Sequence, residues 1–193
     1  MTTEKKLEIE IKIKIESTGI KDFRENIFEN NFRLISPRYL EQNIVFDTPD
    51  KKMKTNNFLL RLRKKGDKNT VTFKRPVKKS LSSAYYKIRE EIEVEVLDFE
   101  NMRKIFTGLG YEPVFIYEKY REVFQKGDVR LMLDETPIGN FIEIEGMEKE
   151  IDRTAQELGY SKSDYIIDNY RSLFRKAGGT GHMQFEYPVV SDQ

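Results

Sequence analysis

A strict alternation of apolar and charged residues opens the chain. Leucine or isoleucine occupies every second position from Leu7 to Ile15, and glutamate or lysine occupies the positions between them. Successive side chains of a β-strand point to opposite faces, so this period of two predicts a strand with one apolar and one charged face. We expect the apolar face of this strand, like those of the strands that follow, to pack against helices.

Seven later segments have the composition of strands, and turn signals such as Thr48-Pro49-Asp50 and Gly66-Asp67-Lys68-Asn69 separate some of them. The predicted strands are residues 39–47, 58–63, 70–74, 87–96, 114–125, 129–134 and 140–145. Apolar residues at helical spacing predict four helices. They are residues 18–32, a helix that follows Asp98 as N-cap and ends near Gly110, and residues 148–158 and 163–174.

Eight antiparallel strands suffice to close a barrel with a narrow interior. We therefore expect an α+β fold, an eight-stranded antiparallel β-barrel with helices packed outside. The chain has 193 residues and no segment that looks like a linker, so residues 1–176 are predicted to form a single domain. Glycines from Gly178 onward begin a tail, residues 177–193, that we expect to be mobile.

Composition narrows the chemistry. The chain has no cysteine, which excludes disulfides, thiolate metal sites and a cysteine nucleophile, and its one histidine, His182, lies in the predicted tail. The net charge of +1 argues against nucleic-acid binding driven by bulk electrostatics. The sequence contains no apolar run of membrane-spanning length and no signal peptide before the first strand, so we expect a cytoplasmic protein with no membrane partner.

Charges of one sign cluster on the polar faces of the predicted strands. Acidic pairs at i, i+2 spacing are Glu8 with Glu10, Glu91 with Glu93 and Glu143 with Glu145. Basic pairs at the same spacing are Lys12 with Lys14, Arg61 with Arg63 and Lys119 with Arg121. A solvated sheet face is the common alternative for any one strand. Like charges side by side on one face disfavour the fold, however, unless a counter-ion lies between them.

A divalent cation between carboxylates explains the acidic pairs. Oxygen ligands without histidine or cysteine favour Mg²⁺ or Mn²⁺. The basic pairs favour a polyanion, because arginine binds phosphate oxygens through a bidentate fork and lysine adds a compact charge. Carboxylate-held metal beside lysines and arginines is typical of phosphoryl or nucleotidyl transfer.

Several motifs stand in a fixed order along the chain. They are Glu8-x-Glu10-x-Lys12, Gln42 to Pro49, Leu60-Arg61-Leu62-Arg63, Thr72-Phe73-Lys74, Arg89-Glu90-Glu91-Ile92-Glu93, Glu118-Lys119-Tyr120-Arg121, Leu133-Asp134, Phe141 to Gly146, and Ser163-Asp164-Tyr165. This ordered set resembles the CYTH family, the triphosphate tunnel metalloenzymes, from about Glu8 to Phe174. The family includes class IV adenylate cyclases, thiamine triphosphatases and inorganic tripolyphosphatases.

The resemblance implies a tunnel that binds a triphosphate along its axis. The implied phosphate ligands are Lys12, Arg61, Arg63, Lys74, Lys119 and Arg121, to which strand alternation adds Arg89 and Arg130. The implied metal ligands are Glu8, Glu10, Asp134, Glu143 and Glu145. The catalytic candidates are Lys12, Glu91 and Glu93, the two glutamates as metal ligands or water-positioning groups. Alternation favours Glu91 over Glu90 as the inward residue.

Three functions fit these residues. The leading prediction is Mg²⁺- or Mn²⁺-dependent hydrolysis of tripolyphosphate or of a small organic or nucleoside triphosphate. The second is a class IV adenylate cyclase that converts ATP to cyclic AMP and pyrophosphate. The third is a noncatalytic module that binds polyphosphate or a nucleotide. A small-molecule triphosphate is the expected partner, and pairing into a homodimer stays open.

Overall fold

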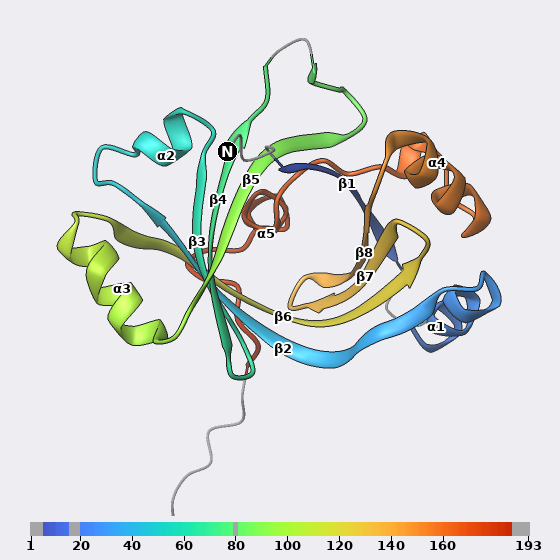
Figure 1. Ribbon diagram of the computed structural model, residues 1–193, viewed down its shortest axis with the longest axis horizontal. Helices are drawn as coiled ribbons and strands as arrows, with labels where there is room; N and C mark the ends of the chain where they lie inside the picture. The colour runs from blue at the N-terminus through green and yellow to red at the C-terminus, as the bar shows by residue number, and fades with distance from the viewer. Residues whose placement is uncertain (1–5, 16–19, 79–80, 187–193) are drawn as a thin grey trace, which may run out of the picture.

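The computed structural model describes residues 6–15, 20–78 and 81–186. Eight antiparallel strands close a barrel in the order β1-β5-β4-β3-β2-β6-β7-β8, which confirms the predicted fold. The strands are β1 (Lys6–Ile15), β2 (Arg33–Asp47), β3 (Leu59–Lys65), β4 (Lys68–Pro76), β5 (Lys87–Val96), β6 (Glu112–Lys126), β7 (Val129–Thr136) and β8 (Gly139–Glu145). Figure 1 shows the barrel with helices around it.

Strand register places opposite charges beside each other inside the barrel. Lys12 of β1 pairs with Glu143 of β8, and Lys74 of β4 pairs with Glu91 of β5. Alternation in each strand puts Glu8, Glu10 and Glu145 on the same inner face as these pairs. The clustering by sign that the sequence shows along each strand is therefore offset by opposite charges across strands.

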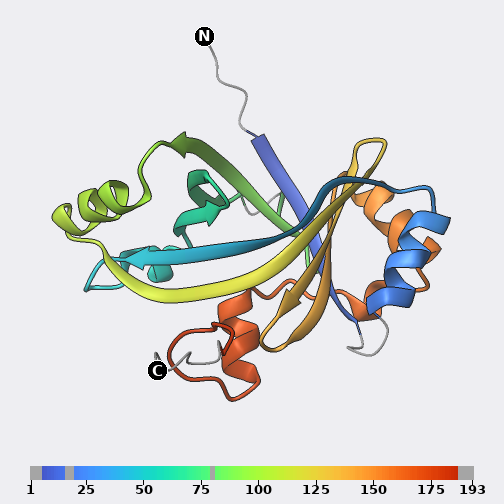
Figure 2. The ribbon, with the colours of Figure 1, turned by 90° about the horizontal axis from the view of Figure 1, so that it is seen from below.

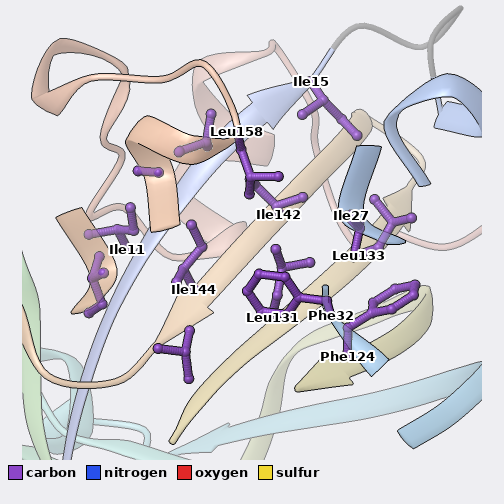
Figure 3. Packing of buried hydrophobic residues seen from close by; sticks show 14 of the residues in the cluster. Ile11, Ile15, Ile27, Phe32, Phe124, Leu131, Leu133, Ile142, Ile144 and Leu158 are labelled. Atoms are coloured by element: carbon purple, nitrogen blue, oxygen red, sulfur yellow. The ribbon is translucent and has the colours of Figure 1, made fainter. Parts of the chain in front are cut away.

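Two helices cover the outer face of β1, β7 and β8. Helix α1 (Ile20–Glu29) and helix α4 (Glu148–Glu157) bury the isoleucines and leucines of these strands in the largest apolar cluster of the described chain. Figure 3 shows Ile144 and Leu131 from the strands facing this cluster, with Ile27 of α1 and Leu158 beyond α4. The apolar face predicted for the first strand packs against helices as expected.

Two further helices cover β2 and β3. Helix α3 (Phe99–Gly108) begins after Asp98, whose side chain accepts a hydrogen bond from the backbone N–H of Asn101, as the N-cap prediction requires. The short helix α2 (Lys52–Thr55) was not predicted, because four residues carry too little periodicity. Helix α3 packs Phe106 against Phe46 of β2 with 5.0 Å between ring centroids.

The outer face of β5 departs from the prediction. Ile92 is 60% exposed and Val94 is 52% exposed, so no helix of the described chain covers the middle of the apolar face, although Ile88 and Val96 at its ends pack against two core clusters. The alternation of β5 was read correctly, but the expectation that each apolar face packs against helices was wrong here.

The predicted helix 163–174 is also wrong. Residues Lys162–Asp164 form one turn of 3₁₀-helix, and Ile166 is extended and exchanges backbone hydrogen bonds of 2.7 and 3.0 Å with Lys12. The β1–β5 pairing stops at Glu10, opposite Lys87. Ile166 therefore pairs with an edge of β1 that β5 leaves free. Only the last part is helical, as α5 (Tyr170–Lys176). In Figure 2, α5 lies at the same end of the barrel as the β7–β8 turn, and we call this the α5 end.

Residues 178–186 belong to the stretch predicted as a mobile tail. In the structure Met183 is completely buried and pairs with β6 through backbone hydrogen bonds to Ile116 and from Glu118. His182 accepts a hydrogen bond of 3.2 Å from the backbone N–H of Ile116 through Nδ1. Residues 187–193 lie outside the described residues.

Candidate functional site

The barrel encloses a cavity of about 980 Å³ that all eight strands line. Fifteen lysines or arginines and eight aspartates or glutamates face it. A charged interior walled by a low-dielectric barrel focuses the field on whatever enters. The excess of cations therefore favours a polyanionic ligand.

Six cations occupy the middle of the barrel, and we call them the cation band. They are Lys12, Arg61, Arg63, Lys74, Lys119 and Arg121. Each was a phosphate-binding candidate in the sequence, and the structure brings all six to one cavity. All except the half-buried Arg63 are at most 7% exposed. Buried cations require counter-charges or a bound anion.

Several buried donors have no acceptor within the described part of the chain. They include Nε of Arg61, Nδ2 of Asn43 and Nε of Arg89. The guanidinium of Arg61 is otherwise held by Thr72 at 3.1 Å and by the Tyr117 hydroxyl at 3.4 Å. A buried donor without an acceptor costs stability unless a ligand or water satisfies it. Arg61 and Arg89 both line the cavity, so their donors fit the oxygens of an anion bound there.

The two arginines suggested by alternation lie on different strands of the cavity wall, Arg89 on β5 and Arg130 on β7. Arg89 donates to the Asn57 side-chain oxygen at 3.0 Å and to its backbone oxygen at 2.5 Å, where β3 is about to begin. Arg130 is exposed at the start of β7, directly opposite Glu145 of β8. Both line the cavity, but neither is part of the cation band.

Lysines neutralise both acidic residues of the first motif. Nζ of Lys74 lies 2.5 Å from each carboxylate oxygen of Glu8, and Nζ of Lys87 lies 2.5 Å from Oε1 of Glu10. Burial and the neighbouring Glu10 carboxylate raise the pKa of Glu8. Burial also opposes ionisation of Glu10, but Lys87 outweighs it and lowers the pKa of Glu10 to about 2.

The acidic pair of β8 lies beside the pair of β1. Glu143 is 2.9 Å from Nζ of Lys12 and also accepts a hydrogen bond from Arg121. Burial works against the charged form of Glu143, yet Arg121 and the two nearby lysines hold its pKa well below the ordinary value. Glu145 stands directly opposite Glu10 in the β1–β8 register. Four candidate metal ligands thus lie on two adjacent strands.

The two glutamates of β5 have different surroundings. Glu91 is half-buried, faces the cavity as alternation predicts, and lies 3.4 Å from Nζ of Lys74. Glu93 is exposed and accepts a hydrogen bond of 2.8 Å from Thr72. Glu90 binds Arg75 at 2.8 Å and is absent from the cavity wall.

Asp134 lies behind the cavity wall. It is completely buried and receives Nζ of Lys119 at 2.9 Å, Nε of Arg121 at 2.5 Å and the Tyr170 hydroxyl at 2.6 Å. It does not line the cavity. Both its oxygens are engaged by protein donors, so in this structure Asp134 anchors two members of the cation band.

A family model for the CYTH domain matches residues 6–169. The chain belongs to the CYTH domain family. A protein of Methanocaldococcus jannaschii, provisionally named an adenylate cyclase, is 31% identical over 178 residues, which cover 86% of this chain and 98% of that protein.

Solved structures of other CYTH-like proteins have the same fold. A Vibrio parahaemolyticus protein with a provisional adenylate cyclase name has a TM-score of 0.77 at 17% identity and covers 89% of this chain and 99% of its own. A Hippeastrum protein with a provisional adenylyl cyclase name and a dominant triphosphatase activity has a TM-score of 0.60 at 18% identity, with 96% and 100% covered. At these identities the likeness establishes the fold.

CYTH enzymes are metal-dependent, and a divalent metal needs several oxygen ligands close together. Within residues 6–15, 20–78 and 81–186, no three carboxylates converge into a ready metal site. The donor chemistry nevertheless fits, because Glu8, Glu10, Glu143 and Glu145 offer only oxygen ligands on neighbouring strands. A metal at this position requires Lys74 and Lys87 to release Glu8 and Glu10.

Sequence reasoning missed five residues at this CYTH site: Glu41, Asn43, Lys87, Tyr117 and Tyr170. Glu41 is 1% exposed and lies 3.4 Å from Arg63 and 3.6 Å from Lys119. Asn43 accepts a hydrogen bond of 2.9 Å from Arg63. The phase of β2 and β5 could have found Glu41, Asn43 and Lys87, because they alternate with outward residues. Tyr170 enters from α5 and has no such signal.

No helix in the described part of the chain is long and apolar enough to cross a membrane.

Proposed function

We propose that this protein is a divalent-metal-dependent triphosphatase that hydrolyses tripolyphosphate or a small organic triphosphate inside the barrel. The observation that carries the proposal is the cation band, six buried or half-buried cations around one cavity, together with donors of Arg61 and Arg89 in the same cavity that find no acceptor among the described residues. A linear triphosphate supplies several anionic oxygens in a row, which matches cations contributed by strands all around the barrel.

The carboxylates distinguish catalysis from simple anion capture. Anion binding needs the cation band but gains nothing from Glu8, Glu10, Glu143 and Glu145 in the same cavity. A Mg²⁺ or Mn²⁺ ion held by these residues supplies neutralisation of phosphate oxygens and a more acidic attacking water. In this proposal the cation band orients the phosphates, and Glu91 positions the water and accepts its proton.

A second function is favoured by the name of the Methanocaldococcus jannaschii relative, which is that of an adenylate cyclase. In that reaction the ribose 3′-hydroxyl of ATP attacks the α-phosphorus and releases pyrophosphate. The same cation band serves either reaction, so the products decide between them.

The test is product analysis with tripolyphosphate, ATP or thiamine triphosphate, each with Mg²⁺ or Mn²⁺. Free phosphate supports the triphosphatase, and cyclic AMP with pyrophosphate supports the cyclase. Binding without turnover of any of the three would reduce the protein to a triphosphate-binding module.

The acidic assignment has its own test. We expect Glu143→Gln or Glu8→Gln to abolish metal-dependent turnover, with the circular dichroism spectrum of the folded protein retained. Full activity of either variant contradicts the metal assignment.

A further inference from the structure

Tyr170 is the first residue of α5, and its side chain reaches into the barrel from the α5 end. It is 6% exposed. Its ring packs edge-on against Phe141 at 5.6 Å and lies 6.1 Å from the ring of Tyr117. These rings belong to an apolar cluster against which Phe174 of α5 also packs. Tyr170 is therefore held in one place by packing.

The Tyr170 ring lies beneath two members of the cation band. Nζ of Lys12 is 4.7 Å from the ring centroid, and Nζ of Lys119 is 5.0 Å from it. An ammonium over an aromatic face is attracted by the ring's quadrupole, and the attraction is stronger in a buried site. The segment before α5 also holds the backbone of Lys12 through Ile166. The ring thus constrains where both ammonium groups point.

The Tyr170 hydroxyl acts on a third cation through Asp134. It donates a hydrogen bond of 2.6 Å to Oδ2 of Asp134, and the same carboxylate binds Arg121 through Nε and a terminal nitrogen at 2.5 and 2.6 Å. A carboxylate offers only acceptor atoms, so the Tyr170 hydroxyl is the donor of this bond.

We propose that Tyr170 is a positioning residue that sets the geometry of three cations of the band for binding a triphosphate. The three are Lys12, Lys119 and Arg121. The inference rests on the proposed function for the identity of the anion. It makes the cation geometry depend on α5, because one side chain from that helix contacts two ammonium groups and anchors the partner of the guanidinium.

The experiment uses Tyr170→Phe, which keeps the ring and removes the hydroxyl, and Tyr170→Leu, which removes both. Tripolyphosphate binding is measured by calorimetry with and without Mg²⁺, and turnover is measured alongside. Because the cation band holds bound substrate as well as the transition state, Tyr170→Phe should raise KM about tenfold, near 1.4 kcal/mol, with kcat changed by less than about threefold. Tyr170→Leu should weaken binding by about tenfold more, because both lysines lose the ring.

Tyr165→Phe is the matched control. Its hydroxyl donates a hydrogen bond of 3.0 Å to Asp152, outside the cavity, so the variant loses a comparable bond to a carboxylate. We expect a similar change in melting temperature from Tyr165→Phe and Tyr170→Phe but unchanged tripolyphosphate affinity in the control.

Equal affinity in wild type and Tyr170→Phe overturns the inference, as does a loss of affinity shared by Tyr165→Phe. If wild-type protein binds tripolyphosphate without hydrolysing it, the triphosphatase proposal is refuted. The affinities of wild type and Tyr170→Phe measured by calorimetry then still decide the positioning role. Wild-type protein that does not bind tripolyphosphate refutes both.

Discussion

Glu41 is one counter-ion of the cation band, and its neutralisation should lower stability while strengthening triphosphate binding. The carboxylate is 1% exposed and lies 3.4 Å from Arg63 and 3.6 Å from Lys119. Burial opposes its ionisation, but these cations and Arg121 hold its pKa below the ordinary value. Removing its negative charge takes the carboxylate away from the half-buried Arg63 and leaves the buried Lys119 with Asp134.

The magnitude follows from the distances. At an effective dielectric constant near 20, a pair of charges about 3.5 Å apart attracts with about 5 kcal/mol before desolvation is subtracted. Breaking one side of a buried pair typically costs about 3–5 kcal/mol net. For a chain of this length, that corresponds to a fall of roughly 10 °C in melting temperature for Glu41→Gln.

The same substitution removes repulsion between Glu41 and a bound triphosphate. Two negative charges about 6 Å apart repel each other by about 3 kcal/mol at an effective dielectric constant near 20 and by about 1 kcal/mol in bulk water. We therefore expect tripolyphosphate to bind Glu41→Gln about tenfold more tightly and to raise its melting temperature more than that of wild type. The assays are thermal unfolding and calorimetry.

Glu122→Gln is the matched control, because Glu122 is 7% exposed but pairs with Arg24 on the outside of the barrel at 2.9 Å. We expect a cost near 1 kcal/mol and no change in affinity. If Glu41→Gln is as stable as wild type, or binds tripolyphosphate no better than Glu122→Gln, the role of Glu41 as counter-ion is refuted.

Two further predictions concern charge and packing. The pKa of Glu10 in the folded chain, about 2, lies below its ordinary value of 4.5, so its contribution to stability is present above pH 4.5 and is lost as the pH falls toward 2. Melting of metal-free protein across this range should show the loss, and a curve just as steep in Glu10→Gln would contradict it. Ile144→Ala, at a completely buried position, should cost about 2–5 kcal/mol of unfolding free energy in urea titration, whereas Ile92→Ala, at a 60% exposed position, should cost less than about 0.5 kcal/mol. Equal costs would show that the outer face of β5 is covered in solution.

The barrel could be predicted because its strands alternate. A period of two needs only neighbouring residues, so β1 and β5 could be placed from local sequence, β5 with both bounds correct and β1 within one residue. The beginning of β2 was missed, because Pro37 interrupts a segment whose register with β6 shifts on both sides of Ser36. Local patterns do not show where a partner strand tolerates such irregularity.

The C-terminal segment could not be predicted, because its structure depends on pairing with a distant part of the chain. Residues 163–174 carry apolar residues at helical spacing, but Ile166 pairs with Lys12, more than 150 positions earlier in the chain, because the edge of β1 is free there. A tertiary hydrogen-bonding requirement overrides a local propensity in such a case. Tyr170 was missed for the same reason, since its role depends on where α5 docks.

The pairing of charges inside the barrel explains why metal and triphosphate suit the site together under the proposed function. Lys74 neutralises Glu8 and Lys12 neutralises Glu143, so these buried charges compensate one another. A triphosphate alone draws the lysines toward phosphate oxygens and leaves the carboxylates buried without partners. A divalent cation alone binds the carboxylates and leaves the lysines buried without partners. Bound together, each ligand takes the partner that the other displaces, so each should strengthen the binding of the other.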